Sequence, residues 1–370
     1  MPSHFLSVSR RLRKTHFTQK VIDSGVRAFT VYNHMLLPTV FKSVEEDYHH
    51  LKKAVQIWDV SCERQVEIKG RDAKSLVQKI VPRDLASLTK TKCLYVPLVN
   101  SKGGMINDPI IIKLDKDRYW ISIADSDVLL WIEGIATALN LNVSIFEPDV
   151  SPLAVQGPKS KGLMIRLFGT EIEHLHFFDI GEFQFMGSTF LISRSGYSKQ
   201  CGYEIYVNQP DLAENLWDAL FEAGKDLNVR AGCPNLIERI EGGLLSYGND
   251  MTIDNTPFEC GLDKFLPKVI SDKCIGADVL NSDHARYPKK MIKSLSIDFT
   301  DRISCEEPWE IFSEKDEHVG QITSAAYSPS FQKVVALGMV NTKVLRLNKT
   351  LYTKIDNKKY HTIAEEKPFI

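Results

Sequence analysis

The sequence has almost no net charge, since its 46 Lys and Arg residues balance 47 Asp and Glu residues and leave a formal charge of -1. This balance argues against nucleic acid or an anionic membrane surface as the main partner. No apolar run approaches the ~18 residues that a membrane span needs, and no apolar segment follows the basic N-terminus as a secretion signal requires. With 43 % hydrophobic and 25 % charged residues, the 370-residue chain has the composition of a soluble globular protein with a sizeable core.

Cysteine is sparse, with seven residues, and no two of them form a C-x-x-C pair. The odd number and wide spacing argue against a disulfide framework or a zinc site, so we expect reduced thiols, no metal and a cytoplasmic location. Common catalytic signatures are missing as well: there is no G-x-x-x-x-G-K-[ST] loop, no H-E-x-x-H, no G-x-S-x-G and no G-x-G-x-x-G after a strand. The ten histidines are scattered and do not suggest a ligand set.

Short strands and helices alternate without regular β-α-β spacing, which predicts an α+β fold. Ser43 and Glu46 form a capping box, the signature of a helix start. Tyr48, Leu51 and Val55 then recur on one face of the predicted helix.

The later part of the chain is predicted to contain two amphipathic helices, over residues 210–227 and 234–245. Beyond them, short β-like runs separated by Gly, Pro and Asn indicate a small β barrel or sandwich, with strands over 292–297, 319–322, 334–339 and 350–355.

We expect three domains arranged around a central cleft. They are an N-terminal α+β domain over residues 1–150, a second α+β domain over 151–284 and a C-terminal β barrel over 285–370. The sequence does not decide whether the protein forms a homodimer.

The stretch from Arg194 to Val207, RSGYSKQCGYEIYV, is the most informative in the chain. It ends as a strand in which Glu204 and Tyr206 share one face, about 7 Å apart. Gly196 and Gly202 precede them in a turn-rich loop, where glycine permits a close approach to a flat ligand. The simpler alternative is an amphipathic edge strand with a solvated Glu.

This stretch resembles the R-x-G-Y-x-G-E-x-G-Y-E-I signature of the glycine-cleavage T-protein (aminomethyltransferase) family of folate enzymes. The resemblance implies that Glu204 holds the pterin ring of tetrahydrofolate, and a carboxylate suits the two-donor edge of that ring. It also assigns Tyr197 to the folate site. Lys199 and Gln200 stand where the family has Gly and Glu.

Further blocks of the family pattern occur in the right order along the chain. Residues 103–108, GGMIND, resemble the G-G-x-x-D-D hairpin, with Asn107 in place of its first acid, and this implies a folate-site and catalytic role for Asp108. Residues 237–251 resemble the L-R-L-E-x-G…Y-G-x-D-M helix and imply that Arg239 also binds folate. A C-terminal G-x-x-T-S…S-P…A-L-G barrel pattern follows from residue 320 to residue 338.

The N-terminal segment around Tyr32, VYNHMLLP, resembles the branch of this family that demethylates dimethylsulfoniopropionate. That resemblance implies transfer of one S-methyl group to tetrahydrofolate. Because an aromatic cage suits a bulky sulfonium, Tyr32, Tyr95 and Tyr206 are the predicted donor contacts. Two alternatives remain open: a true aminomethyltransferase and a non-catalytic folate-binding relative.

Overall fold

The computed structural model describes residues 9–301, 305–346 and 350–370. The chain folds into two compact units, each assembled from segments that are far apart in sequence. Among the described residues, one unit contains 9–65, 148–196 and 200–234, and the other contains 66–147, 197–199, 235–301, 305–346 and 350–370. Each unit combines helices with largely antiparallel sheet, which confirms the predicted α+β class. The three-domain division of the sequence, with boundaries at residues 150 and 284, stays a prediction.

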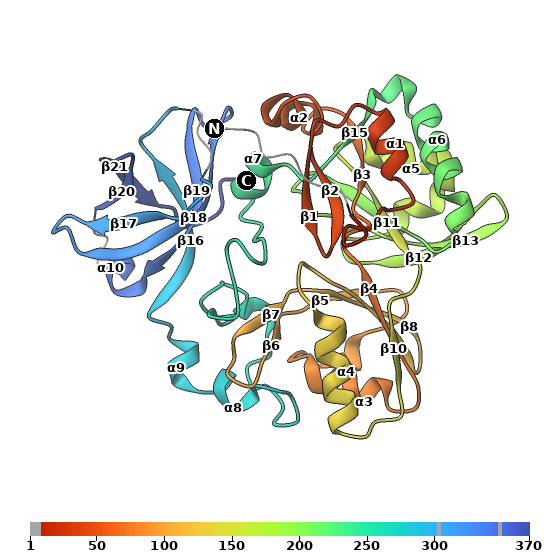
Figure 1. The fold of residues 1–370 in the computed structure, drawn as a ribbon, viewed down its shortest axis with the longest axis horizontal. Coiled ribbons are helices and arrows are strands. Elements are labelled where there is room, and N and C mark those ends of the chain that lie inside the picture. The colour runs from red at the N-terminus through yellow and green to blue at the C-terminus, as the bar shows by residue number, and fades with distance from the viewer. Residues whose placement is uncertain (1–8, 302–304, 347–349) are drawn as a thin grey trace. The chain divides into compact units, whose positions relative to one another are not determined.

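A six-stranded sheet forms the centre of the first unit (Figure 1). Its strands lie in the order β12 (Ile180–Phe185), β13 (Ser188–Ser193), β14 (Gly202–Val207), β11 (Ser151–Gln156), β3 (Val55–Asp59) and β15 (Val229–Gly232). β14 pairs with β13 on one side and with β11 on the other, and all six of its residues are buried. The edge-strand alternative for this stretch is therefore wrong.

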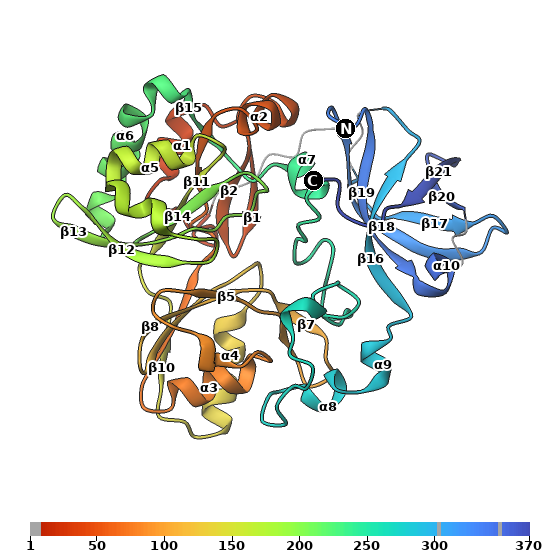
Figure 2. The ribbon, with the colours of Figure 1, turned by 180° about the vertical axis from the view of Figure 1, so that it is seen from behind.

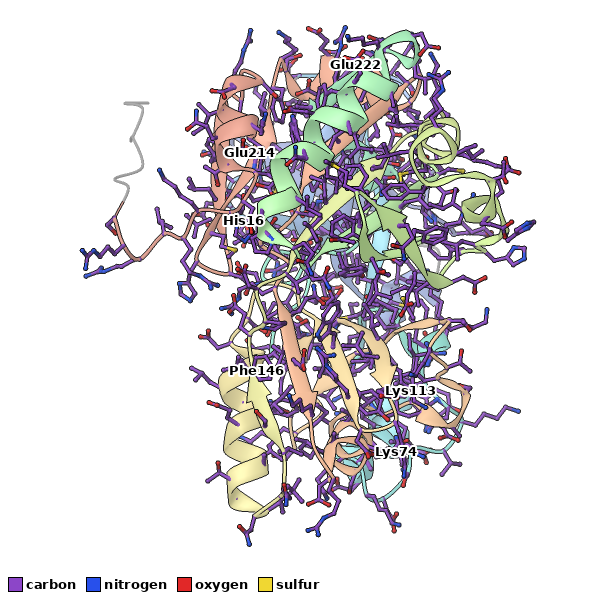
Figure 3. The ribbon with its side chains drawn as sticks, turned by 90° about the vertical axis from the view of Figure 1, so that its right-hand side faces the viewer. His16, Lys74, Lys113, Phe146, Glu214 and Glu222 are labelled. Carbon is purple, nitrogen blue, oxygen red and sulfur yellow. The ribbon has the colours of Figure 1, made fainter. Side chains whose placement is uncertain are left out.

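The core of the first unit lies on one face of this sheet. Tyr203, Ile205 and Val207 of β14 belong to this core, together with residues of α5 (Ser160–Phe168) and α6 (Ala213–Ala223). The intervening Glu204 and Tyr206 therefore point to the opposite face, as strand alternation predicts. Figure 3 shows Glu214 and Glu222 on the outer side of α6, where both are exposed.

The predicted 210–227 helix is divided into three parts in the structure. A 3-10 turn, Pro210–Leu212, leads into α6, and Gly224 separates α6 from a second 3-10 turn, Lys225–Leu227. Gly224 approaches Val229 so closely that a Cβ there would lie 2.8 Å from the Val229 Cβ. The return of the chain into β15 therefore ends the helix.

The remaining elements of the first unit precede β3 or follow α5. They are α1 (Thr18–Asp23), β1 (Ala28–Tyr32), β2 (Met35–Val40), α2 (Val44–Leu51) and the 3-10 helix Thr170–His174. The Ser43 side chain accepts a hydrogen bond from the Glu46 backbone N–H, which confirms the predicted helix start. Val55 lies in β3 and not on this helix, because α2 already ends at Leu51.

The second unit begins with a five-stranded sheet in the order β10 (Ser144–Phe146), β4 (Gln65–Lys69), β9 (Arg118–Ser122), β8 (Ile110–Asp115) and β5 (Cys93–Tyr95). Helices α3 (Ala73–Ile80) and α4 (Val128–Ala138) share one core with it. The 3-10 turn Leu85–Ser87 and the short hairpin β6 (Leu98–Val99) and β7 (Met105–Asn107) complete this part.

Short helices follow β15 and precede the C-terminal barrel in the chain: α7 (Leu236–Glu241), the 3-10 turn Asp263–Phe265, α8 (Ala277–Leu280) and α9 (Asp283–Arg286). α7 is shorter than the predicted 234–245 helix. Gly243 adopts φ +64°, and the Leu244 N–H returns to the Arg239 carbonyl, a common way to end a helix.

Six strands close into a barrel at the C-terminal end of the chain, seen from behind in Figure 2. They are β16 (Lys290–Ile297), β19 (Lys333–Asn341), β18 (His318–Ser328), β17 (Trp309–Ser313), β20 (Leu351–Ile355) and β21 (Lys358–Ala364), with α10 (Thr342–Arg346) between β19 and β20. The predicted β barrel is confirmed. Across the described ranges, no helix has the length and apolar character needed to cross a bilayer.

Candidate active site

Asp108 follows β7 and has an unusual environment for a carboxylate. Its Oδ2 accepts a hydrogen bond of 2.9 Å from the Tyr95 hydroxyl, whereas its buried Oδ1 has no hydrogen-bond partner among the described residues. Burial raises the pKa of Asp108 to about 7, and the Tyr95 hydrogen bond offsets only part of that shift. A buried carboxylate atom without a partner is a candidate contact for a ligand.

Asn107 stands where the hairpin pattern has its first acid, and its side chain makes three hydrogen bonds within the protein. Its Nδ2 donates to the Ala124 carbonyl at 3.0 Å and to Ser126 Oγ at 2.8 Å, and its Oδ1 accepts from the Ala124 N–H at 2.9 Å. An amide can donate and accept at once, whereas an ionised carboxylate can only accept. Asn107 therefore fastens β7 to the loop after β9 and leaves Asp108 as the acid of this hairpin.

The turn that carries Asp108 packs closely against residues 252–256. The Met105 N–H donates to the Asn255 carbonyl at 2.8 Å, and the Tyr247 hydroxyl donates to the Met105 carbonyl at 3.1 Å. Gly104 permits this approach, because a Cβ there would lie 2.0 Å from the Ile253 carbonyl oxygen. The hairpin is thus held in place from its backbone.

Glu204 lies on β14 and is buried beside two serines of the same unit. Ser195 Oγ donates to Glu204 Oε2 at 2.5 Å, and Ser193 Oγ lies 2.5 Å from Ser195 Oγ. Burial raises the pKa of Glu204, and the hydrogen bonds from Ser195 and Ser193 oppose that shift. These serines were missed in the sequence, although Ser193 stands opposite Glu204 once β13 pairs with β14.

Gly196 and Gly202 make room for a side chain of the protein. A Cβ at either position would lie 2.0–2.2 Å from an amide atom of Gln156. The Gln156 Nε2 donates to the Ser195 carbonyl at 3.1 Å and so binds the backbone of the loop that contains Gly196. In this structure the two glycines accommodate Gln156, which differs from the predicted approach to a flat ligand.

The two other aromatic candidates of the first unit lie on different elements. Tyr206 is on β14, on the same face as Glu204, and is 1 % exposed. Tyr32 ends β1 and is partly exposed. Asn33 and His34 follow it with positive φ angles, in a two-residue turn to Met35 that suits Asn.

Tyr197 and Arg239 meet at the backbone that follows α7. The Tyr197 hydroxyl donates to the Leu245 carbonyl at 2.7 Å and to the Leu244 carbonyl at 3.2 Å. Arg239 Nη1 donates to the same Leu244 carbonyl at 3.2 Å and to Asp250 Oδ2 at 2.8 Å. Both polar groups are engaged within the protein, and their predicted folate contacts stay a prediction.

Asp250 ties this backbone to the barrel. Its Oδ1 accepts from Thr323 Oγ1 at 2.7 Å and from Ser324 Oγ at 2.6 Å, and its Oδ2 also accepts from the Ser246 N–H at 2.9 Å. Its side chain is fully buried. The Y-G-x-D-M pattern includes Asp250, but local sequence periodicity does not predict that its hydrogen-bond partners lie on β18.

The structure therefore brings together Tyr95 and Asp108, and separately Tyr197 and Arg239, within one unit. Glu204 and Tyr206 share a strand face in the other unit. Among the described residues, no group of three or more His, Cys, Asp or Glu side chains is placed to hold a metal ion.

Comparison with known proteins assigns most of the chain to one family. Residues 17–269 match the GCVT N-terminal domain, and residues 292–370 match the glycine cleavage T-protein C-terminal barrel domain. The chain belongs to the glycine cleavage T-protein family. A T-protein structure, the glycine cleavage system aminomethyltransferase T of Bartonella henselae, superposes with a TM-score of 0.86 over 97 % of this chain and 98 % of that one, at 22 % identity.

Two relatives within the family share different degrees of sequence identity with the present chain. The present chain is 50 % identical over 333 residues to the dimethylsulfoniopropionate demethylase of Ruegeria pomeroyi, covering 90 % of each chain. It is 27 % identical over 348 residues to an aminomethyltransferase of Staphylococcus epidermidis, covering 93 % of this chain and 94 % of that one.

Proposed function

We propose that this protein transfers one S-methyl group of dimethylsulfoniopropionate to N5 of tetrahydrofolate. The products are 3-methylmercaptopropionate, 5-methyltetrahydrofolate and the proton that N5 loses. The observation that carries the proposal is the 50 % identity to the R. pomeroyi demethylase over 90 % of both chains, against 27 % to the aminomethyltransferase.

The residues around Asp108 suit this chemistry. A sulfonium methyl is already activated, because the leaving group departs as a neutral thioether, so neither an acid nor a covalent nucleophile is needed. What the site must supply is alignment of acceptor and donor, and a negative group near the positive charge as it moves. Asp108 has one carboxylate oxygen without a partner among the described residues, which makes it the candidate for that negative group.

Glu204 is the proposed anchor of the pterin ring. Tetrahydrofolate supplies N5 as the methyl acceptor and presents an amino group and an adjacent ring N–H as two neighbouring donors. The Glu204 carboxylate can accept both, and Ser195 fixes its orientation through Oε2. The hydrogen bonds from the serines favour the ionised carboxylate against its burial.

The donor cation is proposed to rest against an aromatic face, and Tyr95 is the candidate that shares a unit with Asp108. Tyr32 and Tyr206, which belong to the other unit, stay predicted donor contacts. Aromatic faces attract a desolvated onium by about 0.5–2 kcal/mol each. A carboxylate in direct contact would hold the donor more strongly in the ground state than in the transition state, because the positive charge leaves sulfur.

The decisive experiment is product analysis with isotopically labelled dimethylsulfoniopropionate and tetrahydrofolate, run beside aminomethylated lipoyl protein. Label in 5-methyltetrahydrofolate is the expected result. Methylenetetrahydrofolate and ammonia from the lipoyl donor, with no methyl transfer from the sulfonium, would make the protein an aminomethyltransferase. Folate binding without turnover of either donor would make it a non-catalytic relative.

We also propose a cytoplasmic location, because all seven cysteines are unpaired and most are buried. Thiol titration of the unfolded protein purified without reductant should give seven free thiols. Light scattering on the folded protein determines whether it forms a homodimer.

A further inference from the structure

Arg83 is a partly buried cation close to the Tyr95–Asp108 pair. It lies in the loop between α3 and the 3-10 turn Leu85–Ser87, and its Nη1 donates to the Tyr95 carbonyl at 2.8 Å. Within the described ranges, no carboxylate pairs with its guanidinium. Burial lowers the pKa of Arg83, and no acidic neighbour opposes that shift. A partly buried guanidinium without a carboxylate partner among the described residues is well suited to receive one from a ligand.

The Arg83 side chain is held by an aromatic residue that also touches Tyr95. Its guanidinium carbon lies 5.9 Å from the centre of the Phe265 ring. The Phe265 ring in turn meets the Tyr95 ring edge-on, with centroids 4.8 Å apart. Arg83 is therefore oriented by two contacts, the carbonyl of Tyr95 and the ring of Phe265, and both belong to the same cluster as Asp108.

These contacts place opposite charges at the two ends of Tyr95. The hydroxyl end contacts Asp108 Oδ2, and the carbonyl end contacts the Arg83 guanidinium. The proposed donor carries a sulfonium at one end and a carboxylate at the other, separated by two methylene groups. Asp108, the Tyr95 ring and the Arg83 guanidinium thus follow one another in that order, so the ring is available to the sulfonium and the guanidinium to the carboxylate.

We infer that Arg83 binds the carboxylate of the sulfonium donor and makes the site selective for a carboxylated substrate. This inference rests on the proposed function and deepens it. A guanidinium with free N–H groups can hold a carboxylate in a bidentate pair, which also fixes the direction of the methyl group. A second carboxylate source is the glutamyl end of the folate, and the experiment below separates the two.

Lys264 is the natural comparison for Arg83. Its Nζ lies 5.1 Å from the centre of the same Phe265 ring, but Lys264 is exposed. A hydrated ammonium on a flexible stem gains less from a carboxylate than a guanidinium that is already ordered. Lys264→Gln is therefore a matched control, removing one positive charge from the same ring.

The test compares two donors on the full-length protein: dimethylsulfoniopropionate and ethyldimethylsulfonium, which lacks the carboxylate. Formation of 5-methyltetrahydrofolate is measured for wild type, Arg83→Gln, Arg83→Lys and Lys264→Gln. Arg83→Gln should lower kcat/KM for the carboxylated donor about 10- to 100-fold and leave the ethyldimethylsulfonium rate within about twofold of wild type. Arg83→Lys should fall between, and Lys264→Gln should match wild type on both donors.

Wild type supplies a further arm that needs no variant. With wild type, kcat/KM for the carboxamide analogue of the donor should be lower than for dimethylsulfoniopropionate by the same factor that Arg83→Gln causes. The analogue removes the carboxylate of the proposed ion pair, and the variant removes its guanidinium. The inference is overturned if Arg83→Gln affects both donors equally, if Lys264→Gln shows the selective loss, or if the wild-type enzyme uses the carboxamide as well as the acid.

Binding of tetrahydrofolate to Arg83→Gln, measured by calorimetry, separates the two carboxylate sources. Unchanged affinity supports the donor as the ligand of Arg83. Weaker folate binding with unchanged donor kinetics would assign Arg83 to the glutamyl end and overturn the inference. If wild type methylates tetrahydrofolate from neither sulfonium, the proposed function itself fails, an outcome distinct from any effect of Arg83.

Discussion

The Tyr95 hydroxyl contacts only one of the two oxygens of Asp108, at 2.9 Å, while the other oxygen is buried without a hydrogen-bond partner among the described residues. Burial raises the pKa of Asp108 to about 7, because the charged form loses its water, and the single hydrogen bond from Tyr95 offsets only part of that shift. Such a group changes its charge near neutral pH, and a bound cation would favour the ionised form.

The activity should therefore depend on pH through Asp108. The carboxylate is ionised above its pKa, so kcat/KM, which reports the free enzyme, should rise between about pH 6 and pH 8 and then level off. Asp108→Asn should lower kcat more than it raises KM for the donor, and it should flatten this rise. Steady-state kinetics from pH 5.5 to 9 provide the measurement. A variant with intact kcat and an unchanged profile would leave Asp108 as a structural hairpin residue.

The same carboxylate should cost stability at alkaline pH. The folded pKa of about 7 lies above the unfolded value of about 3.9, so the folded state binds more protons between these values. Stability from this group is thus lost as pH rises towards 7, and Asp108→Asn should unfold at higher urea concentration than wild type at pH 8. Asp115→Asn, which changes an exposed acid at the end of β8, is the control and should not shift the midpoint.

Glu204→Gln should weaken tetrahydrofolate binding while preserving the fold. An amide cannot accept both donors of the pterin edge, and losing one charge-assisted hydrogen bond costs about 1.5–3 kcal/mol. Calorimetric titration with tetrahydrofolate measures this change, and circular dichroism verifies the fold. Unchanged affinity would remove Glu204 from the folate site.

Tyr206→Leu should weaken binding of the donor and leave the affinity for folate nearly unchanged. Removing one aromatic face should cost donor binding about 1–2 kcal/mol, and a quaternary ammonium analogue of the donor should lose as much. That analogue should compete without reacting, because an amine leaves far less readily than a thioether. Inhibition constants for the analogue with wild type and variant give the comparison, and equal constants would exclude a cation contact at Tyr206.

The buried pair of Arg239 and Asp250 should matter far more for stability than an exposed pair. The side chains of Arg239 and Asp250 are 8 % and 0 % exposed, whereas those of Lys90 and Asp115 are 60 % and 68 % exposed. Asp250→Ala leaves a buried guanidinium without its anion and should cost about 3–5 kcal/mol in the free energy of unfolding. Asp115→Asn should leave that free energy near the wild-type value, as an exposed pair contributes little.

A double variant, Arg239→Met with Asp250→Leu, adds a second check on this pair. Removing both charges together should destabilise the protein less than Asp250→Ala alone, because no buried charge is left without a partner. A double variant less stable than the single one would show that the hydrogen bonds to Ser324 and Ser246 outweigh the charge pairing.

His50 should make the first unit sensitive to acid. Its Nε2 contacts the Asn228 carbonyl at 2.9 Å and its Nδ1 contacts Gln56 Nε2 at 3.2 Å, an arrangement that suits the neutral ring. Burial lowers the pKa of His50, so the unfolded state binds the proton more readily. Stability should therefore fall as pH drops below about 6.5, the unfolded value. In urea unfolding at pH 7.5 and 5.5, His50→Gln should lose less stability on acidification than wild type does.

Local patterns in the sequence were enough for many of the individual elements. The capping box at Ser43, the short strands of the C-terminal barrel and the alternation of Glu204 with Ile205 all depend on neighbours a few residues away, and the structure has them where expected. The α+β class follows from the same short-range signals. The family patterns placed Asp108 and Glu204 on the right elements, although their roles in the reaction stay predictions.

Only the tertiary structure determined which side chains from distant parts of the sequence pack against these elements or form hydrogen bonds with them. The amide of Gln156 occupies the space that Gly196 and Gly202 leave open, and Asp250 finds Thr323 and Ser324 more than seventy residues away on β18. No periodicity encodes such pairs, because they depend on how strands order themselves in a sheet and how buried polar groups satisfy one another. For the same reason, Arg83 is an ordinary loop arginine in the sequence and becomes a cation facing Tyr95 and Phe265 only when the chain is folded.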